Sequence, residues 1–317
     1  LIVCEKPAAA AKVAEAIAEN RPKKSYRDGV PYYELERGGD NVVVVSALGH
    51  LFTLKNLKPM KSYPFFEVGW VPAHLAARGS GRTKNFSAAI RQLSRGAEKF
   101  VVATDFDNEG SLIGYNALRH LCGEDSVVKA KRMKFSTLTA EDLAESFEDL
   151  LPSLDLENVS AGAARHFLDW YWGMNVSLAM SLAVKSAGKK FARLSAGRVQ
   201  TPTLRILADR EKEIAAFRPV TFWMLKLVLD VGVSEIVAEH SAGRFWEKGK
   251  AEEALAACRE RTAIVSSIQR HSFERRPPVP FNLGALQSEA YRWFGLSPMR
   301  TQKIAQELYQ MALISYP

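Results

Sequence analysis

The chain has 317 residues, a hydrophobic content of 47% and a charged content of 25%, which are ordinary values for a globular protein of two or three domains. No run of about 18 apolar residues occurs, so a transmembrane helix is not expected. The short apolar start Leu1–Cys4 runs straight into charge, which is not the pattern of a signal peptide. A formal net charge of +8 favours an anionic partner, with nucleic acid as the first candidate.

The three cysteines, Cys4, Cys122 and Cys258, are far apart and belong to no CxxC pair. A zinc site or a disulfide framework is therefore not expected. This cysteine usage fits a reducing cytoplasm.

Strands and helices alternate over the first 145 residues. In chain order we expect a strand at Leu1–Cys4, a helix from Pro7 to about Asn20, strands at Tyr32–Leu35 and Val42–Val45, a helix at Asn85–Arg95, a strand at Lys99–Ala103, a helix at Glu109–Leu121, a strand at Lys129–Phe135 and a helix from about Ala140 with Thr139 as its N-cap. Residues 21–29 are expected to form a basic loop, and Gly49–Gly81 to be rich in loops. The alternation predicts an α/β domain with a mostly parallel sheet.

From about Leu156 the pattern becomes helical. The elements expected there are helices at Glu157–Lys185 and Arg198–Ala216, strands between Thr221 and Glu239, a short helix at Ala251–Arg259, a strand at Thr262–Arg270, and helices at Asn282–Phe294 and Ser297–Met311. Pro277, Pro278 and Pro280 mark a linker.

Three carboxylates, Asp105, Asp107 and Glu109, follow one predicted strand, and Glu5 follows another. Open α/β sheets place ligand sites at the carboxyl ends of their strands. Carboxylates at this density repel one another unless a cation lies among them, and hard oxygen ligands suit Mg²⁺. The alternative interpretation is a solvated acidic turn that caps the helix starting near Glu109.

Several motifs together resemble one family. Glu5-Lys6-Pro7 with the later run Ala103–Gly110 (ATDFDNEG) resembles the Toprim domain, which type IA and type II topoisomerases, bacterial primases and some nucleases share. Leu194–Leu204 (LSAGRVQTPTL) resembles the SAGRVQ helix of type IA topoisomerases. The segment from Pro280–Leu286 (PFNLGAL) to Leu313–Pro317 (LISYP) resembles their catalytic segment. The matches span the chain in the family's order, and archaeal enzymes and the topoisomerase half of reverse gyrase are the most similar. The chain is identified as a member of the type IA DNA topoisomerase family.

The resemblance implies an ATP-independent isomerase that cuts one DNA strand, forms a 5′-phosphotyrosine at Tyr316, passes another strand, rejoins the ends and so relaxes negatively supercoiled DNA. A phenol with an ordinary pKa of about 10 needs nearby positive charge or a base to attack a phosphodiester; from the residues alone, Tyr316 reads as a core tyrosine at a helix end. The resemblance assigns Lys6 to the charge on the scissile phosphate or to the leaving 3′ oxygen. It makes Glu5 a metal ligand or a proton-transfer group, and gives Mg²⁺ the ligands Glu5, Asp105, Asp107 and Glu109.

The resemblance also predicts DNA contacts. Arg165 and Asp169 are four residues apart on one helix face and match strand-binding positions of the family, although an ordinary ion pair would look the same. Arg198 is expected on a DNA phosphate, with Ser195 and Gln200 lining the strand; helix packing is the alternative. Residues 170–172 (WYW) offer base-stacking surfaces, with packing the favoured interpretation. His50 is expected to be structural rather than catalytic.

The family's architecture is a torus. It implies a Toprim domain at 1–150, a helical DNA-binding domain at 151–220, a strand-rich arch segment at 221–278 and the start of the catalytic-tyrosine domain at 279–317. The family's arginine after the Tyr-Pro pair and a later histidine would lie beyond Pro317, so these 317 residues are expected to relax DNA weakly or not at all. Asn108 stands where the family usually has Arg, and Ser111 where it has Glu. The expected setting is a monomer on single-stranded or negatively supercoiled DNA, cytoplasmic and nucleoid-associated, without a membrane.

Three alternatives stay open. A Toprim nuclease or primase accounts for the carboxylates but not for SAGRVQ or the SYP ending. A single-strand DNA-binding Toprim protein that does not cut would bind DNA without forming an adduct. The topoisomerase half of reverse gyrase would require an ATPase domain before Leu1, and no P-loop occurs in this sequence.

Overall fold

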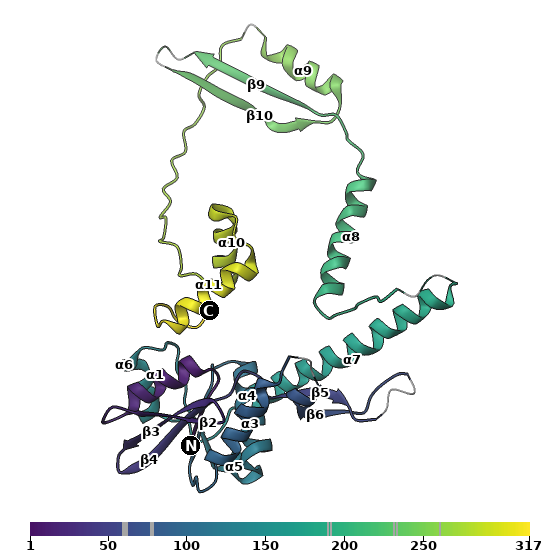
Figure 1. The fold of residues 1–317 in the computed structure, drawn as a ribbon. Coiled ribbons are helices and arrows are strands. Elements are labelled where there is room, and N and C mark those ends of the chain that lie inside the picture. Colours follow the sequence, from purple (N-terminus) through teal and green to yellow (C-terminus); the bar gives the residue numbers. More distant parts are fainter. Residues whose placement is uncertain are drawn as a thin grey trace. The chain divides into compact units, whose positions relative to one another are not determined.

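In the computed structural model the chain divides into two compact units, Leu1–Gln200 with Pro280–Pro317, and Thr201–Val279 (Figure 1). The structure describes residues 1–58, 63–76, 79–188, 190, 192–230, 232, 234–259 and 261–317. None of the helices in these ranges is both long enough and apolar enough to cross a lipid bilayer.

A six-stranded sheet forms the centre of the first unit, in the order β2-β3-β4-β1-β7-β8. Its strands are β1 (Ile2–Cys4), β2 (Lys23–Arg27), β3 (Val30–Arg37), β4 (Asp40–Ser46), β7 (Phe100–Ala103) and β8 (Ala130–Arg132). The pairs β4–β1, β1–β7 and β7–β8 are parallel, whereas β2 and β3 add an antiparallel edge. The predicted α/β domain with a mostly parallel sheet is confirmed.

Helices cover both faces of this sheet (Figure 1). One face carries α1 (Pro7–Ile17) and α6 (Ala140–Glu148), and the other carries α3 (Arg82–Leu93), α4 (Asn108–Ala117), its π-helical continuation η1 (Leu118–Cys122) and α5 (Glu124–Lys129). Successive residues of β1 enter opposite cores, Ile2 and Cys4 on the α1 side and Val3 on the α3 side. A strand that is buried on both faces has an uninterrupted apolar sequence, which explains the apolar start of the chain.

The long helix α7 (Leu156–Ser186) packs closely against α4. At Gly162 a Cβ atom would lie 2.5 Å from the backbone oxygen of Asn108, so only glycine permits this approach. One helical turn further along α7, Arg165 and His166 are thereby brought to Glu109.

Two segments predicted as loops contain strands. The supposed basic loop 21–29 includes β2, an edge strand whose charged side chains suit a solvated edge. The stretch Gly49–Gly81 contains the antiparallel pair β5 (Phe52–Asn56) and β6 (Val68–Pro72), followed by α2 (Ala73–Ala76). Residues 59–62 and 77–78 of that stretch, including Pro59, lie outside the described residues.

The first unit also contains α10 (Leu283–Phe294) and α11 (Pro298–Gln310), which pack on each other. Asn282 and Ser297 cap these two helices through their side chains, close to the predicted starts. Thr139 caps α6 as predicted.

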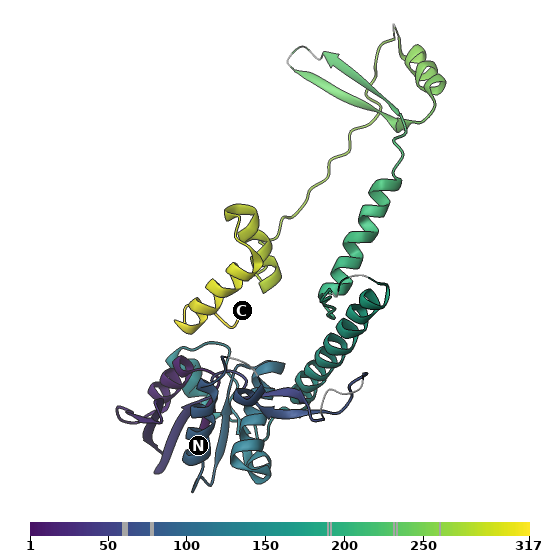
Figure 2. The same ribbon diagram turned by 45° about the vertical axis from the view of Figure 1, so that its right-hand side comes forward.

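The second unit pairs β9 (Trp223–Asp230) with β10 (Glu235–Phe245) and packs α9 (Lys248–Cys258) beside them (Figure 2). It also contains most of α8 (Gln200–Ala216). The predicted strand at Thr262–Arg270 is wrong, because the described residues 261–282 have no regular secondary structure. Its apolar residues Ile264, Val265 and Ile268 are exposed, and strand propensity is not expressed without a neighbouring strand to pair with.

The approach of α7 to α4 yields a matched pair of substitutions. Gly162→Ala should destabilise the chain by about 1–3 kcal/mol, because the new methyl group meets the carbonyl of Asn108. Gly173→Ala lies on the same helix, where the nearest atom to a new Cβ is 3.9 Å away, and should be neutral or stabilising by up to about 1 kcal/mol. Urea unfolding followed by circular dichroism measures both, and equal effects of the two changes would contradict this packing.

Candidate active site at the carboxyl edge of the sheet

The site begins where two neighbouring parallel strands end. Cys4 of β1 pairs with Ala103 of β7, so Glu5 and Thr104 leave the sheet side by side. The loop after β7 then carries Asp105 and Asp107, and Glu109 lies in the first turn of α4. Both acidic motifs therefore lie just past strand carboxyl ends, as expected.

The loop after β7 is held from beneath by Arg132. This side chain is 1% exposed and donates hydrogen bonds to the carbonyls of Val102, Met133 and Asp105 at 2.8–2.9 Å. Burial lowers the pKa of Arg132 to about 10, against the opposing charges of Asp105 and Asp107, so the guanidinium is still a cation at neutral pH. The sequence reasoning missed Arg132, although its signal was available: β8 alternates, and Arg132 falls on the inward side.

A tight turn connects the loop to α4. A Cβ at Gly110 would lie 2.2 Å from the carbonyl oxygen of Asp105, and the hydroxyl of Thr104 donates to the carbonyl of Gly110 at 2.7 Å. Asp107 is the N-cap of α4, accepting a hydrogen bond from the Gly110 amide at 2.6 Å. The capping interpretation of the acidic run is thus correct for Asp107, and one oxygen of that carboxylate remains for other partners.

Lys6 lies among the carboxylates. Its Nζ is 3.0 Å from Glu5 and 3.7 Å from Asp105. Burial alone would lower the pKa of Lys6, but Glu5 and Asp105 raise it above its ordinary value. Burial and the charge of Glu5 raise the pKa of Asp105 to about 6, against the opposing charge of Lys6. The cluster thus holds more negative charge than one lysine offsets.

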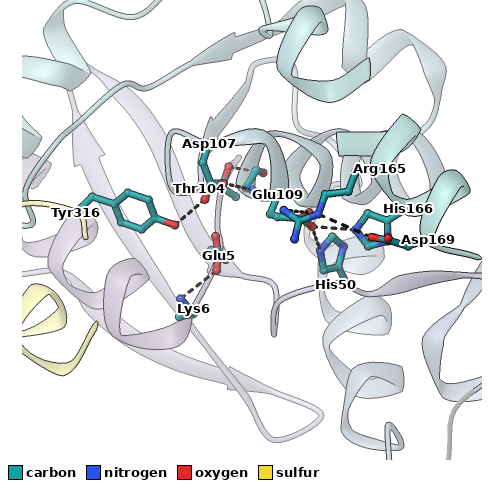
Figure 3. Close-up of polar contacts among 11 residues, drawn as sticks. Glu5, Lys6, His50, Thr104, Asp107, Glu109, Arg165, His166, Asp169 and Tyr316 are labelled. Atoms are coloured by element: carbon teal, nitrogen blue, oxygen red, sulfur yellow. Dashed lines mark hydrogen bonds and ion pairs between the residues drawn. The ribbon is translucent and has the colours of Figure 1, made fainter. Parts of the chain in front are cut away.

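Two tyrosines from the C-terminal segment reach these acids. The hydroxyl of Tyr316 donates to Oδ2 of Asp107 at 2.6 Å (Figure 3). That of Tyr309 donates to Oδ1 of Asp105 at 3.1 Å. The amide of Tyr316 also donates to the carbonyl of Ser136 at 2.9 Å. Burial first, and then the contact with Asp107, raise the pKa of Tyr316 well above its ordinary value, so the phenol is neutral at physiological pH.

Tyr309 was not predicted as a site residue. It is 2% exposed and packs with the core residues on the α1 side of the sheet, and its ring lies 5.3 Å from that of Tyr316. The sequence did not predict this role, because a tyrosine on the apolar face of an amphipathic helix is expected to be an ordinary core residue.

Glu109 lies apart from the other three carboxylates. Its Oε2 accepts hydrogen bonds from Nε2 of His50 and Nε2 of His166, both at 2.8 Å, and its Oε1 lies 3.6 Å from Arg165 (Figure 3). Burial alone would raise the pKa of Glu109, but the two histidines lower it. The four predicted metal ligands therefore divide into Glu5, Asp105 and Asp107 on one side and Glu109 on the other.

The predicted DNA-contact residues form two small groups in the first unit. Asp169 lies between two arginines, 2.7 Å from Nε of Arg198 and 3.9 Å from Arg165. Gln200 donates to the hydroxyl of Ser195 at 3.1 Å. The predicted helix start at Arg198 is corrected, because α8 begins only at Gln200.

The segment before α8 is held to α7 by two serines. Ser181 accepts a hydrogen bond from the amide of Leu194, and Ser177 accepts one from the amide of Ala196. These serines were not singled out from the sequence. Because residues 194–196 are not in a helix or strand, their amides have no regular backbone partner, and the two serine hydroxyls accept their hydrogen bonds instead.

The aromatic run on α7 is partly packed. Tyr171 stacks on Phe167 and donates to the carbonyl of Phe66, in line with the packing interpretation, whereas Trp172 is 47% exposed. Of the two positions that differ from the family pattern, Asn108 is exposed and Ser111 is buried.

Comparison with known proteins agrees with this geometry. A Toprim domain model matches residues 1–138, and a DNA topoisomerase model matches residues 153–317. The chain belongs to the type IA DNA topoisomerase family. It is 43% identical to DNA topoisomerase 1 of Pyrococcus furiosus, covering all of this chain and 30% of that protein. With DNA topoisomerase 3 of Bacillus subtilis it shares 30% identity, covering all of this chain and 42% of that protein.

A solved structure of full-length topoisomerase I from Thermotoga maritima matches with a TM-score of 0.65 and 26% identity, covering 98% of this chain and 46% of that one. The family assignment and the predicted succession of a Toprim domain and a topoisomerase domain are confirmed. The chain spans less than half the length of these type IA relatives.

Arg132 gives a stability prediction. Arg132→Met should destabilise the chain by about 2–5 kcal/mol, because it removes the three hydrogen bonds that the guanidinium donates to backbone carbonyls in a buried place. Lys131→Met changes the exposed neighbour on the same strand and should shift the free energy of unfolding by less than about 0.5 kcal/mol. Urea unfolding compares the two, and an Arg132→Met chain as stable as the Lys131→Met chain would show that these bonds do not support the acidic loop.

Proposed function

We propose that this chain carries the DNA-cleaving centre of a type IA topoisomerase, with Tyr316 as the nucleophile. The observation that carries the proposal is the 2.6 Å hydrogen bond from the Tyr316 hydroxyl to Asp107, across 209 residues of sequence. It brings a phenol to the carboxylates that follow β1 and β7, which is where an open α/β sheet places its chemistry.

In the cleavage step, the phenol oxygen of Tyr316 forms a bond to phosphorus while the bond from phosphorus to the 3′ oxygen breaks. The phenol proton passes to Asp107, which already accepts its hydrogen bond. Lys6 stabilises the charge on the phosphate and supplies the proton for the 3′ oxygen, since Glu5 and Asp105 keep it protonated. The cut strand is left with its 5′ phosphate on Tyr316 and a free 3′ hydroxyl. Reversal of the same transfers rejoins it without ATP.

The carboxylates suit a divalent metal, which Toprim domains bind, and we propose Mg²⁺. The donors are oxygens, and burial together with the charge of Glu5 raises the pKa of Asp105, so a cation beside it would stabilise the ionised carboxylate. Glu5, Asp105 and Asp107 would hold the ion, with Glu109 the most distant of the four proposed ligands. When bound, Mg²⁺ supplies electrostatic stabilisation and holds the cut ends in place.

The proposed DNA path follows Arg165, Asp169, Ser195, Arg198 and Gln200. In this structure Asp169 orients both Arg165 and Arg198 through ion pairs on the exposed surface. A phosphate that binds Arg198 would share it with Asp169, so the pair presents a positioned guanidinium rather than a freely moving one. The exposed Trp172 offers a stacking surface for an unpaired base.

Strand passage and relaxation of negatively supercoiled DNA belong to the proposed function of the intact protein. The domain divisions at 150, 220 and 278, an arch at 221–278, a monomeric state and a cytoplasmic place at the nucleoid are parts of the same proposal. The chain spans less than half the length of the relatives named above, and we expect these 317 residues alone to cleave a single strand but to relax DNA weakly or not at all.

Substitution of the nucleophile tests the proposal directly. The chain is incubated with a single-stranded oligonucleotide labelled at its 3′ end and denatured in detergent, and the label should migrate with the protein. Tyr316→Phe should abolish this adduct, because the substitution removes the attacking oxygen. Tyr291→Phe, on an exposed face of α10, should leave it unchanged.

Labelling the 5′ end instead provides the polarity control, since a 5′-phosphotyrosine leaves that end free. Adduct formation by Tyr316→Phe would contradict the assignment of the nucleophile. DNA binding without an adduct under any condition would favour the alternative of a Toprim protein that binds single strands without cutting them.

A further inference from the structure

Two imidazoles converge on one carboxylate oxygen beside the proposed cleavage centre. Nε2 of His50 and Nε2 of His166 both lie 2.8 Å from Oε2 of Glu109, and the ligand atoms of all three residues are within 4.8 Å of one another. A single hydrogen bond would suffice to orient a glutamate. Two histidines on the same oxygen instead form a set of two nitrogens and one oxygen around a common point.

Three separate parts of the first unit fix these side chains. His50 follows Gly49, whose amide donates to the carbonyl of Glu5 at 3.3 Å, so its loop is tied to the end of β1. His166 lies on α7, and the close approach at Gly162 sets its distance from α4. The ring of His166 is 4.8 Å from that of His50 and 5.5 Å from that of Trp70. The donors are therefore held in place by packing and not only by their mutual hydrogen bonds.

The site is open to ions from solvent. The side chains of His50, His166 and Glu109 are 30%, 29% and 33% exposed. Arg165 lies on the other oxygen of the carboxylate, 3.6 Å from Oε1, and is itself largely exposed. Arg165 is thus a positive neighbour of the site, but its contact is with the oxygen that the two imidazoles do not share.

The donor set selects the class of metal. Imidazole nitrogens favour zinc and its neighbours in the first transition series, whereas Mg²⁺ prefers oxygen ligands alone. Two histidines and a glutamate hold zinc in known enzymes, with a fourth position left for water or substrate. Zinc with ligands at about 2.0–2.1 Å in tetrahedral geometry needs them about 3.4 Å apart. The two nitrogen–oxygen contacts of 2.8 Å must therefore lengthen, and a pair at the 4.8 Å limit of the set must close, which small side-chain rotations of the two histidines provide.

We propose that His50, Glu109 and His166 bind a divalent transition metal of the zinc class, at a site distinct from the carboxylates Glu5, Asp105 and Asp107. The cysteines of the chain gave no reason to expect zinc, and none of them takes part. This consequence rests on the proposed function: when a metal occupies this site, Glu109 is not available as a ligand for magnesium. The bound metal keeps one coordination position free for water or substrate. Zinc at this site therefore opposes magnesium-supported cleavage.

Cobalt(II) is the probe for the test, because its visible absorption reports nitrogen and oxygen ligands directly. The chain is titrated with Co²⁺ without DNA, and zinc affinity is measured by calorimetry. The wild type should show a saturable spectral component from nitrogen and oxygen ligands, without a thiolate charge-transfer band. His50→Gln and His166→Gln retain an N–H donor for Glu109 but lose the imidazole ligand, and each should weaken binding at least about 10-fold.

Two matched variants should bind cobalt as the wild type does. Glu5→Gln changes the carboxylate cluster alone, and His271→Gln changes an exposed histidine in the segment that follows α9. Loss of the cobalt spectrum in Glu5→Gln but not in the two histidine variants would assign the ion to the carboxylate cluster and overturn the proposal. A wild type that binds no cobalt would show that the two histidines only orient Glu109.

The link to cleavage has its own readout. Zinc should suppress the covalent DNA adduct in the wild type and do so less in His166→Gln, at equal magnesium. If the wild type forms no adduct, the proposed function fails, while the cobalt titration still decides the metal site. Equal suppression by zinc in both proteins would overturn the opposition to magnesium. Thermal unfolding of each variant in EDTA verifies that it is folded.

Discussion

A neutral phenol and a carboxylate that are 209 residues apart in the chain meet where the central sheet ends. The Tyr316 hydroxyl donates to Asp107, and the buried Tyr309 hydroxyl donates to Asp105 next to it. A backbone hydrogen bond from Tyr316 to Ser136 and the packing of Ala312 and Ile314 on the α1-side core fix the same segment. The cleavage chemistry proposed for this chain depends on that attachment, because a phenol away from the acids has no charged partner to work with.

The acids are held in place by close backbone approaches. Gly110 allows the tight turn in which Asp107 caps α4. The buried side chain of Arg132 donates hydrogen bonds to three backbone carbonyls at the base of the same loop. Gly162 brings α7 against the start of α4, so that Glu109 meets His166 instead of lying free beside Asp107. Three inconspicuous residues thus decide how four carboxylates share their partners.

Much of the first unit was predictable from periodicity and caps. The apolar runs predicted β1 and β7, because a strand buried on both faces has apolar residues at nearly every position. Thr139 correctly predicted the start of α6. The motifs also placed Glu5 and Asp105 at one edge of the sheet. The direction of Glu109 was not predictable, because it depends on the distance between two helices and not on local sequence. Tyr309 and Arg132 were missed for a similar reason, since their partners lie far away in the chain. The strand expected at Thr262–Arg270 failed because propensity alone supplies no pairing partner.

The most direct measurement is a double-mutant cycle between the two groups that meet at the sheet edge. Tyr316→Phe removes the donor, and Asp107→Asn removes the charge while keeping a side chain that can cap α4. The free energy of unfolding of the wild type, both single variants and the double variant gives the coupling between them. The contact described here predicts a coupling of about 1 kcal/mol or more, as for a hydrogen bond to a charged group. If the double variant loses the sum of the free energies of unfolding lost by the two single variants, within about 0.3–0.5 kcal/mol, the phenol does not contact this carboxylate in solution.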